Sequence, residues 1–109
     1  MAQQENKKDS GMKIWLKCEI SVGQLSGEFV VMAKDFRGTA FSLFVPDDFV
    51  DVERAPNSDE IVDGWLEVDV IDANDRMALI KLPRTPLENG QTVTVNTNQL
   101  AQRKVFAFA

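Results

Sequence analysis

The sequence contains no histidine and only one cysteine, Cys18, among its 109 residues. The absence of histidine excludes the commonest general base, the commonest metal ligand and every Ser-His or Cys-His nucleophile pair. A lone cysteine cannot form an intramolecular disulfide, so we expect a reducing compartment, the cytoplasm. Both absences argue against an enzyme, and we expect a protein without catalytic residues.

Long apolar runs are also missing. No stretch is long enough to span a membrane, and residues 1–11 contain no apolar segment, so we expect a polar N-terminal tail and no secretory signal. The composition is 44% hydrophobic and 27% charged, with a net charge of −5. Such a chain has the profile of one globular domain, which we expect over residues 12–101.

Alternation of apolar and polar residues is the strongest pattern in the chain. Between residues 13 and 22 every second side chain is apolar: Ile14, Leu16, Cys18, Ile20 and Val22. This period predicts a half-buried strand with Cys18 as a core thiol, because successive side chains of a strand point to opposite faces. Runs of the same kind predict five more strands, at 28–34, 39–45, 64–71, 76–82 and 91–96.

Six short strands with close turns predict an all-β fold, a small antiparallel barrel of five to six strands with at most one short helix. The order of the elements favours an OB-like barrel first and an SH3-like barrel second. Residues 47–54 fit either a short helix or a strand, and 98–104 fit a helical turn or a tail. Residues 102–109 are expected to form a tail or an added edge strand. No internal repeat is detected.

Acidic residues are concentrated between residues 47 and 76, where eleven of them stand against Arg54 and Arg76. This segment could bind a basic partner, but we favour an ordinary solvated surface that keeps the domain soluble. Residues 72–75 superficially resemble a calcium loop. The twelve-residue pattern requires glycine and a carboxylate where this chain has Met77 and Pro83, so we expect no metal and no cofactor.

Two tryptophans lie on the polar faces of their predicted strands, and Trp15 is flanked by two lysines. A ring interleaved with cations could stack nucleic-acid bases, although the net negative charge opposes phosphate binding. The simpler interpretation, which we favour, is that the C-terminal phenylalanines or the 46–63 connection cover the rings. The candidate nucleic-acid site consists of Lys13, Trp15, Lys17, Lys34, Arg37 and Trp65.

The second and third predicted strands are apolar on both faces. One face must enter the core, so the other is either covered or available for contact. Our leading hypothesis is therefore a module for protein–protein interaction or self-association as a homodimer. Nucleic-acid binding is the second choice, and we expect no membrane partner. The candidate interaction patch consists of Val30, Met32, Ala40 and Phe44, together with Phe106 and Phe108.

Overall fold

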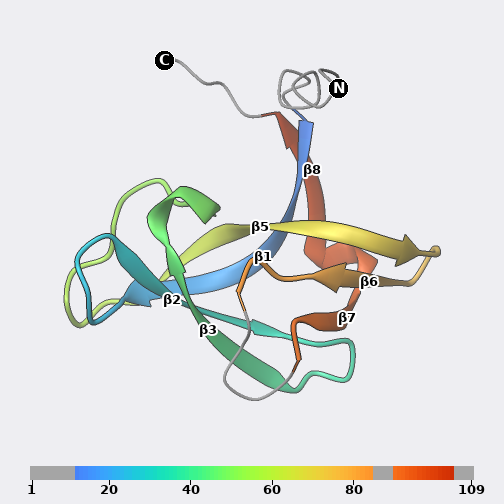
Figure 1. The fold of residues 1–109 in the computed structure, drawn as a ribbon, viewed down its shortest axis with the longest axis horizontal. Helices are drawn as coiled ribbons and strands as arrows, with labels where there is room; N and C mark the ends of the chain where they lie inside the picture. The colour runs from blue at the N-terminus through green and yellow to red at the C-terminus, as the bar shows by residue number, and fades with distance from the viewer. Residues whose placement is uncertain (1–11, 85–89, 105–109) are drawn as a thin grey trace, which may run out of the picture.

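The computed structural model describes residues 12–84 and 90–104, which form an antiparallel sheet curled into a half-barrel (Figure 1). The all-β, barrel-like prediction is confirmed. None of the described residues forms a helix long and apolar enough to cross a membrane. The elements are β1 (Met12–Val22), β2 (Glu28–Lys34), β3 (Ala40–Pro46), η1 (Asp47–Phe49), β4 (Val50–Asp51), β5 (Val62–Ala73), β6 (Met77–Lys81), β7 (Thr92–Asn96), η2 (Thr97–Gln99) and β8 (Leu100–Lys104).

The core is built from the alternating faces that the sequence predicts. On β1, Leu16 and Ile20 are fully buried and Cys18 is 5% exposed, whereas Val22 at the strand end is 42% exposed. The inward residues of β2 and β3 also enter the core, and the described residues include no buried polar side chain. Burial of such a side chain contributes about 1.5–3 kcal/mol, which is why the alternating faces determine the register of each strand. The inward residues of β2 and β3 include Val31, Ala33, Phe41, Leu43 and Val45.

The strand order is β3-β2-β1-β5-β6-β7, which joins two three-stranded meanders through the central pair β1–β5. Both ends of the sheet come together where the β2–β3 turn meets the other meander. The Phe36 amide donates to the Thr94 carbonyl at 2.9 Å, and the Gln99 side-chain amide donates to the Lys34 carbonyl at 2.8 Å. Strands β1, β2 and β3 are consecutive hairpins, and β5 returns by a long connection to lie beside β1, which is a Greek-key arrangement. The OB-like and SH3-like expectations both stay predictions.

The structure contains an internal repeat that the sequence analysis misses. Strands β5 and β8 and the single-turn helix η2 begin 50 residues after β1, β4 and η1, respectively. Both halves therefore run as three strands, one 3₁₀ turn and a short closing strand. Identical side chains at this offset include Trp15 and Trp65, Leu16 and Leu66, and Val45 and Val95. The repeat is hard to detect in the sequence because many other matched positions differ in character, such as Lys13 and Asp63 or Phe44 and Thr94.

A pseudo-two-fold axis relates the two halves and passes through the central strand pair. Leu16 faces Leu66 in the β1–β5 register, and both are fully buried. The closing strands are exchanged: β4 pairs with β5 of the second half, whereas β8 pairs with β1 of the first half. Leu66 is therefore matched with Val50, and Leu16 with Leu100. This is the geometry of a two-fold dimer with swapped closing strands, contained in one chain.

Two segments that the sequence leaves open share one structure. Of the two alternatives for 47–54, the strand is observed at Val50–Asp51 as β4, and the helix is limited to the single 3₁₀ turn η1 before it. In the second half, η2 leads into β8, which begins at Leu100. In β5 the register with β6 shifts between Val70 and Asp72, as at a β-bulge, and Val70 beside the shift is 39% exposed. Residues 105–109 lie outside the described residues.

Candidate functional site

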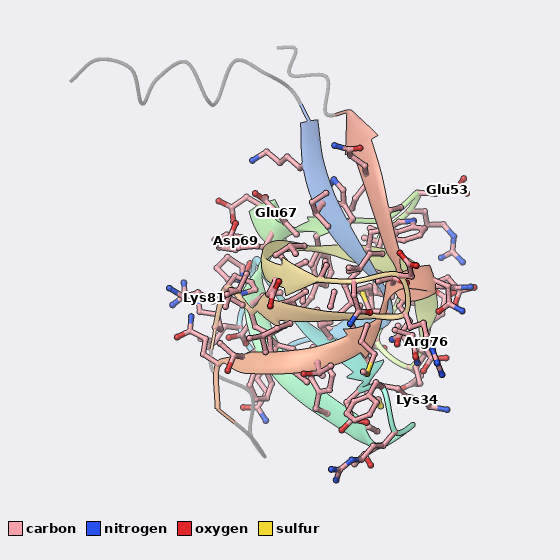
Figure 2. All side chains as sticks on the ribbon, turned by 90° about the vertical axis from the view of Figure 1, so that its right-hand side faces the viewer. Lys34, Glu53, Glu67, Asp69, Arg76 and Lys81 are labelled. Atoms are coloured by element: carbon pink, nitrogen blue, oxygen red, sulfur yellow. The ribbon has the colours of Figure 1, made fainter. Side chains whose placement is uncertain are left out.

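The outer face of the central strands holds the charged and aromatic residues that the sequence singles out. Lys13 on β1 forms an ion pair with Glu67 on β5, with Nζ and Oε2 2.8 Å apart. Figure 2 shows Glu67 and Asp69 pointing outward on the same side of the molecule. The carboxylate therefore lies beside the lysine that the nucleic-acid hypothesis needs for phosphate.

Trp15 is covered. Only 5% of its surface is exposed, and its indole Nε1 has no hydrogen-bond partner among the residues that the structure describes. It lies between Glu67 and Ala101 in the strand register, outside the main core cluster. The Trp15 ring is therefore covered and not exposed, and it cannot stack on a nucleic-acid base unless the surrounding residues move.

Trp65 is only partly covered and borders a hollow of about 630 Å³. Across the sheet it faces Lys17 on β1 and Asp51 on β4. The segment after β4 forms the opposite wall. The full lining is Lys17, Asp51, Val52, Glu53, Arg54, Val62, Asp63, Gly64 and Trp65.

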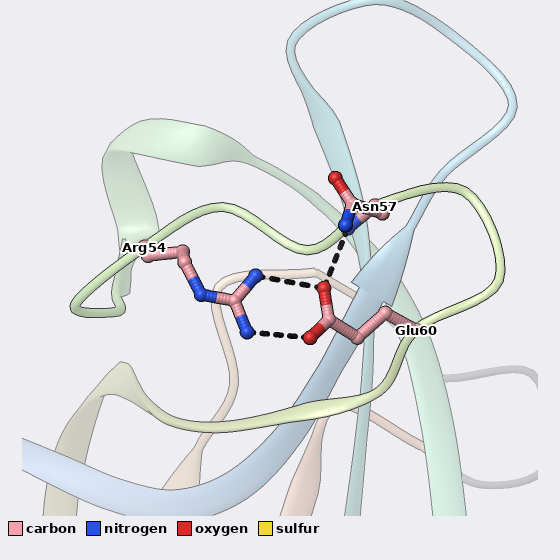
Figure 3. A network of polar contacts seen from close by, with 3 residues as sticks. All are labelled: Arg54, Asn57 and Glu60. Carbon is pink, nitrogen blue, oxygen red and sulfur yellow. Dashed lines mark hydrogen bonds and ion pairs between the residues drawn. The ribbon is translucent and has the colours of Figure 1, made fainter.

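A clamp between Arg54 and Glu60 holds the wall of this hollow (Figure 3). The guanidinium binds both carboxylate oxygens, with Nη1 2.8 Å from Oε1, and the Asn57 amide donates to Oε1 at 2.9 Å. These hydrogen bonds to the ionised carboxylate, led by the one from Arg54, lower the pKa of Glu60 from 4.5 to about 2. The same contact raises the pKa of Arg54.

We expect Arg54→Ala to raise the pKa of Glu60 from about 2 towards 4.5, measured by NMR titration of its side-chain carboxyl carbon. The pKa of Glu60 is lower in the folded chain than in the unfolded chain, so its ionised form stabilises the fold at pH values above the unfolded pKa. This contribution disappears as the pH falls through about 2. Arg76→Ala, which removes a distant arginine, serves as the control and should leave the titration unchanged. A midpoint near 4.5 in the intact chain would contradict the clamp.

Two of the remaining cations of the predicted nucleic-acid site, Lys17 and Lys34, lie close together. Lys34 ends β2 and borders a smaller hollow of about 270 Å³, which Lys17 and Asp63 also line. Arg37 lies in the next turn, where its guanidinium carbon is 5.5 Å from the centroid of the Phe36 ring. Lys13, by contrast, is engaged with Glu67.

The predicted interaction patch lies on the outer face of the β2–β3 hairpin. Val30 faces Phe44 and Met32 faces Ser42 in the register, while Ala40 is exposed opposite Lys34. Phe44 is 37% exposed, and Val30 and Met32 are half-buried. The two phenylalanines assigned to the same patch, Phe106 and Phe108, lie outside the described residues.

Cys18 has the environment of a core side chain. Burial is the main cause that raises the pKa of its thiol to about 12, and the charges of Glu19 and Asp63 add to the effect. A thiol with this pKa is almost entirely protonated at neutral pH, so it is a poor nucleophile.

Comparison of the chain with protein-family models, curated proteins and solved structures finds no match. The site must therefore be interpreted from its own chemistry. The sequence analysis names Lys17 and Trp65 but misses Asp51 and Asp63 as their neighbours. Only the pairing of β5 with both β1 and β4 brings these residues together, and no local pattern reveals that pairing.

Proposed function

We propose that this protein is a non-catalytic interaction module that self-associates through the outer face and outer edge of the β2–β3 hairpin. The observation that carries the proposal is an apolar strip at a sheet edge. Val30, Met32 and Phe44 form the strip, and β3 pairs only with β2 among the described strands. Exposed apolar edge strands are templates for pairing with another chain.

The edge strand β3 also lacks the charges that usually block such pairing. Residues 39–46 contain no charged side chain. A neutral strand can pair antiparallel with its own copy about a two-fold axis, because no like charges then face each other. Such pairing would place the Phe44 rings of both copies on one continuous sheet face, next to Val30.

The second half of the molecule provides an internal comparison. At the 50-residue offset, the outward positions of β7 are polar, with Thr94 where β3 has Phe44 and Asn96 where β3 has Pro46. The β7 edge is also contacted by the Phe36 amide. The apolar edge is therefore a property of the first half alone, which supports a specific role for it.

The state of Cys18 is consistent with a binding protein. Cys18 is buried with a raised pKa, so it does not offer a reactive thiolate. A buried thiol is compatible with the cytoplasm, the compartment that we propose. The nucleic-acid alternative gains no support, because it needs an accessible Trp15 ring and an unengaged Lys13.

Sedimentation equilibrium from low micromolar to millimolar protein tests this proposal. We expect a concentration-dependent shift from 12.2 kDa to twice that mass. Phe44→Asp should weaken the dimer by about 2 kcal/mol or more, because a charge would be buried at the centre of the contact. Thr94→Asp, at the equivalent position of β7, should leave dimerisation intact.

Two results would overturn self-association. One is a wild-type chain that stays at 12.2 kDa up to millimolar concentration. The other is an equal loss of dimer in Phe44→Asp and Thr94→Asp, since a specific β3 contact predicts different effects at the two edges.

A further inference from the structure

The pseudo-two-fold axis allows the two tryptophan positions to be compared within one molecule. Trp15 and Trp65 occupy equivalent places on β1 and β5, yet Trp15 is 5% exposed while Trp65 borders the 630 Å³ hollow. Next to Trp15 stands Ile14, whereas Gly64 stands next to Trp65. The first position is closed and the second is open, although strand geometry places both rings on the same outer face.

The charges around the two rings differ in the same way. Beside Trp15, Lys13 is neutralised by Glu67 at 2.8 Å. Beside Trp65, the equivalent positions carry the opposite charges. Asp63 is equivalent to Lys13, and Lys17 is equivalent to Glu67. Both Asp63 and Lys17 line the hollow. The open position thus has its own charge pattern and is not simply a less complete copy of the closed one.

Carboxylates predominate in this hollow. The exposed carboxylates of Glu53 and Asp63 line it against Lys17, since the other lining cation, Arg54, is bound to both carboxylate oxygens of Glu60. Among the described residues no three acidic or other ligating side chains are placed to hold a metal ion. The negative charge therefore fits a larger, organic cation.

We propose that the hollow binds a cationic side chain of a partner protein, an arginine or a lysine, over the Trp65 ring. A guanidinium or ammonium group is attracted to the face of an indole, and tryptophan is the strongest of the aromatic side chains in this role. The carboxylates on the rim supply complementary charge, and the Arg54–Glu60 clamp holds the wall. The hollow shares no lining residue with Val30 or Phe44, so this site is independent of self-association.

The test is an NMR titration of the full-length, isotope-labelled protein with N-acetyl-arginine methylamide. We expect a saturable shift of the Trp65 indole N–H signal and of amide signals in 51–54 and 62–65. The citrulline analogue has nearly the same shape without the charge, and it should bind about ten-fold more weakly or not at all. Added salt should weaken binding of the arginine compound, because the carboxylates of Glu53 and Asp63 are solvent-exposed.

Two matched variants locate the site. Asp63→Asn removes a rim carboxylate and should weaken binding about five-fold. Asp69→Asn removes a carboxylate from the same face of β5, opposite Lys81, and should leave the affinity unchanged. In Figure 2, Asp69 lies on the opposite side of the view from Glu53, which belongs to the hollow.

Three outcomes would overturn the proposal: no saturable shift at Trp65, equal binding of arginine and citrulline compounds, or equal weakening by Asp63→Asn and Asp69→Asn. The sedimentation experiment uses different residues, so either proposal can fail while the other stands.

Discussion

Replacing Leu16 by alanine is expected to lower the free energy of unfolding by about 3–4 kcal/mol. Leu16 is fully buried and faces Leu66 at the pseudo-two-fold axis, where both halves of the sheet meet. The neighbouring strands are held in register on both sides, so the cavity cannot close easily. For a domain with about 5–15 kcal/mol of total stability, this loss is large. Urea unfolding at low protein concentration measures it.

Leu25→Ala is the matched control, because Leu25 lies in the β1–β2 turn and is 69% exposed. Its unfolding free energy should change by no more than about 0.5 kcal/mol. The double variant of Leu16 and Leu66 should deviate from additivity, since the two side chains are direct partners in the register. A cost below about 1 kcal/mol for Leu16→Ala would contradict the central position of this pair.

Gly64→Ala is expected to destabilise the fold by about 2 kcal/mol through overpacking. A Cβ atom at Gly64 would lie 2.7 Å from Val52 Cγ1 and 2.8 Å from Ile20 Cγ1. Ile20 is fully buried, so the backbone of β5 would have to move away from β4. Thermal unfolding should therefore show a clear drop in the midpoint temperature.

Gly90→Ala provides the comparison for this variant. A Cβ atom at Gly90 meets no heavy atom within 4 Å, so the midpoint should change little or rise slightly. If Gly64→Ala and Gly90→Ala unfold at the same temperature, the close approach of β4 to β5 is incorrect. The wall of the Trp65 hollow would then need revision as well.

Local patterns were sufficient to predict β1, β2, β3, β5, β6 and β7, but not the closing strands β4 and β8, because 47–54 fits either a helix or a strand and 98–104 fits a helical turn or a tail. A strand with one buried face must alternate, and 13–22 does so without interruption, which is why the predicted and observed bounds of β1 nearly coincide. The inward faces of β2 and β3 followed from the same rule. The apolar character of the outward face of these strands, which includes Phe44, could also be predicted, because the sequence is apolar on both faces.

Long-range pairing could not be predicted in this way. β1 pairs with β2, β5 and β8 along its length, and only this arrangement reveals the exchange of closing strands. The two tryptophans illustrate the same limit. Each precedes a leucine on an alternating strand, yet one is buried and the other borders a hollow. At Trp65 the chain that follows β4 lines the hollow, a long-range feature that no local pattern reveals.

Self-association through β3 is the central functional claim, and amide hydrogen exchange tests it most directly. The two proteins are compared at one concentration, at which the wild-type chain is dimeric. The β3 amides that do not donate to β2 should then exchange at least about ten-fold more slowly in the wild-type chain than in Phe44→Asp. Amides of β7 should exchange equally in both proteins. Identical exchange of the β3 amides in the two proteins would contradict pairing at this edge.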